Sequence, residues 1–168
     1  MDKKLTIREI TLFGVLGALT FALQVAMAPL PNIEPVSLLV MLYAATFGWK
    51  CLYPVYVFVA MEILFYGFSI WNIYYLYVWT VLALAAILMR HQQSTLLWAF
   101  LSAVYGLCFG ALCGIVDIFI GGFAYAGTKW VSGIPFDLLH CGGNFVITMI
   151  LFKPLRNALE KLYLKMKR

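Results

Sequence analysis

Charged residues are scarce in this chain of 168 residues, where Asp, Glu, Lys and Arg together account for only 11% of the positions. In soluble domains about a quarter of the residues are charged. Hydrophobic residues make up 64% of the chain, and its mean hydropathy is +0.94. This composition excludes an ordinary water-soluble domain and indicates an integral membrane protein. Six spans of about 20 residues would use roughly 120 positions, which leaves no room for a large soluble domain.

Motifs typical of enzymes are also missing. The sequence contains no HExxH, GxSxG or Walker nucleotide-binding pattern, so catalysis by these routes, including ATP hydrolysis by the chain itself, is not expected. The four cysteines lack CxxC spacing and accompanying histidines, which excludes an ordinary zinc site. We therefore expect no metal and no cofactor, and we interpret the chain as a non-enzymatic protein.

Long apolar runs, separated by Pro, Gly and charged residues, predict an all-α fold. We expect a single membrane domain, residues 1–168, built as a bundle of six transmembrane helices. The predicted spans lie near residues 10–28, 36–49, 51–68, 70–89, 95–120 and 134–152. The segment PLPNIEP, residues 29–35, contains three prolines and is expected to be a loop. The basic tail, residues 153–168, has apolar residues at helical spacing and is either a surface helix or a basic stop after the last span.

The basic residues predict the orientation in the membrane. With six spans, eleven of the twelve Lys and Arg residues fall on one side, and only Lys129 falls on the other. Because cations favour the cytoplasmic side, both termini are expected in the cytoplasm of a bacterial cell, with the chain in the plasma membrane. The net charge of +5 could suggest nucleic acid, but the cations flank apolar spans and form no basic stripe. The expected surroundings are a lipid bilayer, without nucleic acid.

Small residues recur every four positions in two predicted spans. Gly14, Ala18, Ala22 and Ala26 form one stripe, and Gly106, Gly110 and Gly114 form another. Such stripes allow close approach of a second helix, either within the chain or from a partner. For the first stripe both alternatives remain open, whereas for the second we favour packing within the chain.

Acidic residues of the middle of the chain gather, in this topology, on the side opposite the cations. They are Glu34, Glu62, Asp117 and Asp137. Charged groups are costly near a bilayer and persist there mainly for function. In addition, Asp137, His140 and Asn144 are spaced by three and four residues and so share one helical face, which should point into the bundle. This convergence predicts a binding pocket open to the outside, with a stabilising internal network as the alternative.

The residue types in this pocket constrain its ligand. Carboxylates and amides with almost no cation disfavour a polyanion, whereas aromatic faces favour a flat ring or a cation, so a neutral or cationic heterocycle fits best. The candidate ligand contacts are Asn32, Glu34, Glu62, Trp71, Asn72, Tyr74, Asp137, His140 and Asn144.

The chain resembles the substrate-binding S components of energy-coupling-factor (ECF) transporters, small bacterial membrane proteins that capture vitamins. The resemblance covers nearly the whole length: six predicted spans, the alanines of the first span, the PLPNIEP loop and the closing IPFDLLHCGGNFVITMILFKPL. It implies capture of a vitamin-like small molecule from outside, followed by docking on a transmembrane T component that is driven by two ATPase subunits. The docking surface would be Gly14, Ala18, Ala22 and Ala26.

Two other functions compete with this interpretation. The first is a self-sufficient channel or proton-coupled carrier that uses its buried acids as proton relays. The second is a membrane enzyme centred on Asp137 and His140, for which the sequence offers no obvious nucleophile.

Overall fold

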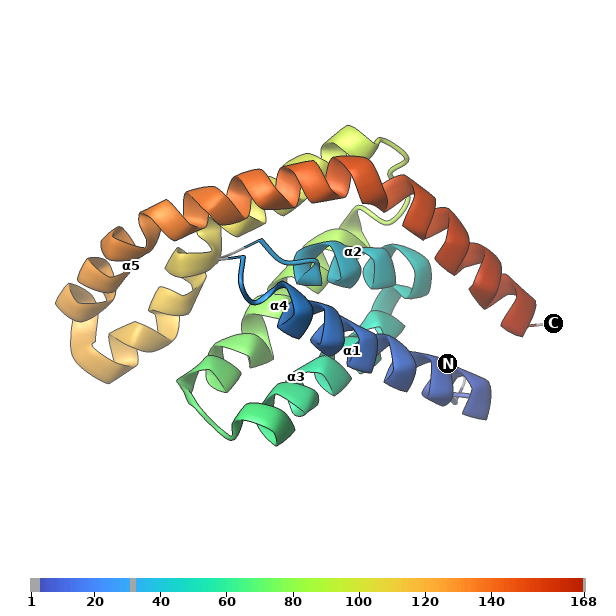
Figure 1. Ribbon diagram of the computed structural model, residues 1–168, viewed down its shortest axis with the longest axis horizontal. Coiled ribbons are helices and arrows are strands. Elements are labelled where there is room, and N and C mark those ends of the chain that lie inside the picture. The colour runs from blue at the N-terminus through green and yellow to red at the C-terminus, as the bar shows by residue number, and fades with distance from the viewer. Residues whose placement is uncertain (1–3, 31–32, 168) are drawn as a thin grey trace.

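The computed structural model describes residues 4–30 and 33–167, and over these residues the chain is helical, without strands (Figure 1). The elements are α1 (Ile7–Met27), α2 (Val36–Phe47), the 3-10 turn η1 (Gly48–Cys51), α3 (Leu52–Tyr66), α4 (Ile70–Leu88) and α5 (Thr95–Met166). The all-α prediction is thus confirmed, and a helix or part of one covers each of the six predicted ranges.

Helix α5 consists of two helical limbs that follow each other along the chain. At Gly122 the backbone leaves the helical conformation, with φ 78° and ψ 179°, a region that favours glycine. Figure 1 shows the chain reversing near this point, so that the helix after Gly122 first runs back alongside residues 95–121, and its last part then continues past them toward the start of α1. We call these the first limb (95–121) and the second limb (123–166).

Helix α2 forms the centre of the molecule. Ten of its twelve residues are buried, and it packs against both α4 and α5. A helix that is apolar all round is expected in an interior rather than at a surface. At 1.5 Å per residue, twelve residues reach only about 18 Å, less than the roughly 30 Å of a bilayer core.

Several helical stretches have the length and composition of membrane spans. Within residues 4–30 and 33–167 there are four such stretches: Ile7–Met27, Val36–Tyr66, Ile70–Leu88 and Thr95–Met166. The protein is therefore all-helical with helices suited to a membrane. The count of four treats α2 with α3, and the two limbs of α5, as single stretches, so six separate crossings stay a prediction.

The beginning and the end of the described chain lie at the same end of the molecule (Figure 1). Arg8 Nη1 donates to the Met166 carbonyl at 3.2 Å, and the Tyr163 hydroxyl donates to Glu9 Oε1 at 2.7 Å. Lys50 Nζ reaches the same Glu9 oxygen at 2.7 Å. These contacts place the start of α1 against the end of α5. The compartment that they face stays a prediction.

The tail predicted from residue 153 is part of α5. The helix continues through Pro154 to Met166, and Tyr163 on its buried face packs on Phe47 at a ring-centroid distance of 4.8 Å. Leu155 and Leu162, two of the apolar residues at helical spacing in this tail, are exposed.

The two small-residue stripes differ in what they contact. In α1 the close approach to α3 is made by Gly17, where an added Cβ would lie 2.6 Å from Val57 Cβ. In the predicted stripe, by contrast, a Cβ at Gly14 would meet nothing within 4 Å, and Ala22 and Ala26 are exposed. That face of α1 is left uncovered at Gly14, Ala22 and Ala26.

The glycines of the first limb lie against the second limb, as expected for internal packing. A Cβ at Gly106 would lie 2.9 Å from the backbone carbon of His140, and one at Gly110 would lie 2.5 Å from Asp137 Oδ2. Only Gly114 has no neighbour within 4 Å.

Gly106→Ala is expected to lower the thermal unfolding midpoint, because the methyl group would press on backbone that cannot move aside, at a cost of about 1 to 3 kcal/mol. The matched control is Gly142→Ala on the second limb, where an added Cβ meets nothing within 4 Å. Removing a helical glycine there should be neutral or stabilising by up to about 1 kcal/mol. Thermal melts of both variants in the same detergent test this packing, and equal midpoints would contradict it.

Candidate functional site

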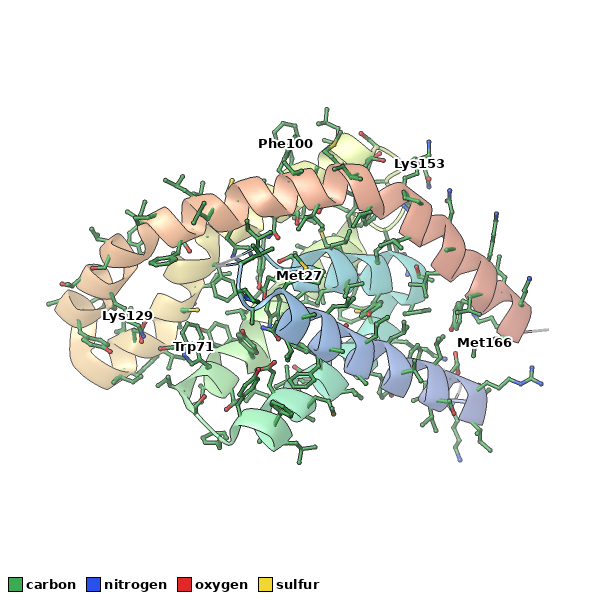
Figure 2. All side chains as sticks on the ribbon, in the orientation of Figure 1. Met27, Trp71, Phe100, Lys129, Lys153 and Met166 are labelled. Carbon is green, nitrogen blue, oxygen red and sulfur yellow. The ribbon has the colours of Figure 1, made fainter. Side chains whose placement is uncertain are left out.

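A cavity of about 770 Å³ lies at the end of the molecule remote from Met166. Figure 2 shows Trp71 and Lys129, two of its lining residues, near each other at this end. The wall is built from the end of α1, the turn after it, α3, α4 and both limbs of α5. Its volume falls within the range of roughly 300 to 1,000 Å³ that is usual for small-molecule sites.

Most of the predicted site residues meet at this cavity. Its lining includes Glu34, Glu62, Trp71, Asn72, Tyr74, Asp137 and His140. Asp117 lines it as well, so the four acidic residues that the sequence placed on one side do gather at one cavity. That these residues contact a ligand stays a prediction.

Asn144, a further predicted site residue, does not line the cavity. It is buried on the same face as Asp137 and His140. Its Nδ2 donates to the Ser102 carbonyl at 3.1 Å and so ties the second limb to the first. The prediction that Asn144 contacts the ligand therefore has no support from its position. Asn32 lies outside the described residues.

Glu34 forms the centre of a polar group on one wall. Its Oε2 accepts a hydrogen bond from Gln24 Nε2 at 3.3 Å, and the same amide donates to the Tyr75 hydroxyl at 3.1 Å. His140 Nε2 lies 3.9 Å from Glu34 Oε1. Burial raises the pKa of Glu34 to about 7; the Gln24 hydrogen bond opposes this rise, and the nearby Glu62 carboxyl adds to it. Glu34 thus changes charge near neutral pH.

The raised pKa of Glu34 predicts a pH-dependent stability. The folded protein holds the Glu34 proton up to a pH of about 7, whereas the unfolded chain releases it near 4.5. The stability from this group is therefore complete below pH 4.5 and is lost as the pH rises to about 7. The thermal midpoint should fall between pH 5 and pH 8, and it should fall less in Glu34→Gln. The same pH dependence in both proteins would contradict the prediction.

Asp117, on the first limb of α5, is held by partners on α4 and on the second limb of α5. Its Oδ1 accepts from the Tyr74 hydroxyl at 2.5 Å and from Lys129 Nζ at 2.8 Å, and Lys129 also reaches the Tyr74 hydroxyl at 2.9 Å. The Lys129 ammonium lies 5.1 Å from the centre of the Tyr74 ring. Lys129, the single cation that the sequence placed on this side, thereby compensates one of the four carboxylates. Asp117, Lys129 and the Tyr74 hydroxyl thus bind one another within the cavity wall.

Asn72 also has a structural role. Its Oδ1 accepts from the Ser69 backbone N–H at 2.6 Å and from the Ser69 hydroxyl at 3.2 Å, forming a capping box at the start of α4. The carbonyl oxygen of this side chain is therefore already engaged at the cavity wall.

Asp137 is positioned by a glycine on the facing limb. Its Oδ1 accepts from the Gly110 backbone N–H at 3.1 Å, and a Cβ at Gly110 would collide with Oδ2. Because position 110 carries no side chain, the carboxylate can lie flat against the first limb. One oxygen is thus anchored while the other, Oδ2, has no hydrogen-bond partner among the described residues.

Other buried polar atoms of the wall also lack hydrogen-bond partners among the described residues. They are Gln24 Oε1, Glu62 Oε1, and both ring nitrogens of His140. Leaving a buried polar group unpaired costs about 1 to 3 kcal/mol, so native structures pair nearly all of them with protein, water or ligand. The part of the wall around Glu62, Asp137 and His140 therefore has unpaired polar atoms, whereas Asp117 has hydrogen-bond partners within the protein.

Aromatic side chains form much of the remaining wall. They are Tyr66, Trp71, Tyr74, Tyr75, Phe109, Trp130 and Phe136. The sequence did not single out Phe109, whose ring centroid lies 5.1 Å from that of His140, or the Lys129–Asp117 pair. The isolated position of Lys129 among acids was the one signal that could have indicated the pair. The wall therefore combines free carboxylate oxygens with rings able to stack on a flat ligand.

No group of three or more His, Cys, Asp or Glu residues suited to hold a metal ion occurs in the described part of the chain. Comparisons of the chain with protein-family models, with curated proteins and with solved structures gave no match.

Proposed function

We propose that this chain is the substrate-capturing S component of an ECF-type importer for a water-soluble vitamin or a related heterocycle. The observation that carries the proposal is the cavity at one end of the helices, where unpaired carboxylate oxygens of Glu62 and Asp137 lie among aromatic rings. The sequence resemblance to S components supports it independently.

The charge of the cavity defines the substrate class. Lys129 is already paired with Asp117, so Glu34, Glu62 and Asp137 face the cavity without a compensating Lys or Arg among the described residues. Such a wall favours hydrogen-bond donors and positive charge on the ligand, and the rings favour a planar group. The proposed substrate is a neutral or cationic heterocycle.

In the proposed topology the chain crosses a bacterial plasma membrane six times with both termini in the cytoplasm. The distribution of Lys and Arg supports this orientation, as does the contact between the start of α1 and the end of α5. The cavity then opens to the outside, where substrate is captured.

Transport itself requires partners in this proposal. A T component would dock on the face of α1 that carries Gly14, Ala18, Ala22 and Ala26, of which all but the half-buried Ala18 are uncovered. Two ATPase subunits would supply the energy. The chain itself would bind substrate and not hydrolyse ATP.

Calorimetric titration of the purified protein with a panel of vitamins tests the proposal. We expect one heterocycle, neutral or cationic, to bind tightly, and the anions pantothenate, niacin and biotin to bind weakly. In liposomes that contain this chain alone, bound substrate should turn over poorly. Rapid uptake into such liposomes, driven by a proton gradient, would instead establish the self-sufficient carrier. Chemical conversion of the ligand, abolished by His140→Ala with little loss of affinity, would establish an enzyme.

A further inference from the structure

A second cavity, of about 460 Å³, lies at the other end of the molecule, where the start of α1 meets the end of α5. It is lined by the end of α2, η1, the turn after α4, and the last part of α5. Its basic side chains are Lys50, Arg90, His91, Arg156 and Lys167. No carboxylate is part of its lining among the described residues.

Arg156 holds the turn that forms one side of this cavity. Its guanidinium donates to the carbonyl oxygens of Gln92 at 2.8 Å and Arg90 at 3.0 Å, and to Glu160 Oε1 at 2.7 Å. Trp98 Nε1 donates to the same Gln92 carbonyl at 3.1 Å. The turn between α4 and α5 is thus fixed from two positions on α5, and the backbone that carries Arg90 is held in place.

The other side of the cavity is built around Gly48. This residue ends α2 with φ 59°, and a Cβ there would lie 3.1 Å from Arg90 Nη1. Glycine at this position serves both the backbone conformation and the close approach of the Arg90 guanidinium. Lys50, two residues further on, is tied to Glu9 at 2.7 Å.

Two of the cations have no acidic partner. Lys50 pairs with Glu9, and Arg156 pairs with Glu160. Among the described residues, Arg90 and Lys167 form no ion pair: Arg90 Nε donates to His91 Nε2 at 3.1 Å, and the Lys167 ammonium lies 4.3 Å from the centre of the Tyr163 ring. Both side chains are exposed, so the cavity presents uncompensated positive charge.

We infer that this cavity binds the phosphate-bearing headgroup of an anionic phospholipid. Guanidinium and ammonium groups at one site suit phosphate oxygens, with Arg90 able to donate two parallel hydrogen bonds. We assign the phosphate to a lipid because the cavity lies at the ends of helices suited to a membrane, where lipid headgroups are found. Trp49, 62% exposed, lies in the lining, and tryptophan is typical of the membrane interface. Basic pockets between helices at this boundary are known to hold such headgroups.

Native mass spectrometry of the detergent-purified full chain tests this inference. The protein is titrated with equal concentrations of dioleoyl phosphatidylglycerol and dioleoyl phosphatidylcholine. We expect at least a fivefold preference for phosphatidylglycerol in the wild type, reduced to twofold or less in Arg90→Gln/Lys167→Gln. The matched control is Lys161→Gln/Lys165→Gln, which removes two exposed cations of α5 outside this cavity and should leave the preference unchanged.

The inference would be overturned by an absence of preference in the wild type or by a preference that survives in Arg90→Gln/Lys167→Gln. An equal loss of preference in Lys161→Gln/Lys165→Gln would also overturn it, because that result would indicate an effect of charge alone without a site. Competition with inorganic phosphate distinguishes a lipid headgroup from free phosphate as the ligand of this cavity. At millimolar concentration inorganic phosphate should fail to displace phosphatidylglycerol, and displacement would make the cavity a free-phosphate site.

Discussion

Ala22→Trp is expected to reduce substrate uptake to background in cells that contain the T component and its ATPases, without changing the affinity of the purified protein. Ala22 is exposed on the uncovered face of α1 and is not part of the cavity wall. Small residues let two helices approach closely in a membrane, and an indole ring at this position would hold the partner helix away. Uptake of radiolabelled substrate and calorimetric titration measure the two effects separately.

Leu84→Trp on α4 is the control for this experiment. Leu84 is 39% exposed and lies outside both cavities, so the substitution places the same indole ring on a different face. Uptake should remain near the wild-type level. If Ala22→Trp loses binding as well as uptake, the stripe packs inside the chain. If it keeps both, docking takes place elsewhere.

Asp137→Asn is expected to weaken substrate binding by about 1 to 3 kcal/mol, roughly 5- to 150-fold in Kd. The substitution keeps the size of the side chain and leaves an oxygen able to accept the Gly110 N–H. It replaces an anionic acceptor, Oδ2 in the present structure, by a neutral group. The effect should therefore appear in affinity while the fold is kept, and titration with substrate measures it.

Glu160→Gln controls for the loss of one negative charge. Glu160 pairs with Arg156 at the other end of the molecule and does not line the large cavity. It should bind substrate with the wild-type affinity. An unchanged titration curve for Asp137→Asn would remove this residue from the site.

Much of the helical architecture was predictable, because the apolar runs are long and are broken by Pro, Gly and charge. α1 and α4 begin and end within about three residues of the predicted spans. The predicted gap between the fifth and sixth spans was too long. The prediction left residues 121–133 between two spans, whereas the structure keeps them helical except at Gly122. A single residue with positive φ can reverse a helix, and hydropathy does not detect it.

The candidate site was predictable where it depends on spacing. Asp137 and His140 lie one helical turn apart, and both line the cavity. Spacing also put Asn144 on that face, but it could not show that Ser102 of the facing limb engages its amide. The Lys129–Asp117 pair bridges the reversal at Gly122, and such pairing depends on how the chain turns back.

Mass spectrometry under native conditions, on protein purified from cells grown in rich medium, tests the central claim most directly. The large cavity predicts a retained small molecule at one copy per chain, neutral or cationic and containing a planar ring. The mass should disappear or decline sharply in Asp137→Asn and persist in Glu160→Gln. Protein that carries no such molecule, and whose thermal midpoint no vitamin in a broad panel raises, would contradict the claim that this chain captures a substrate.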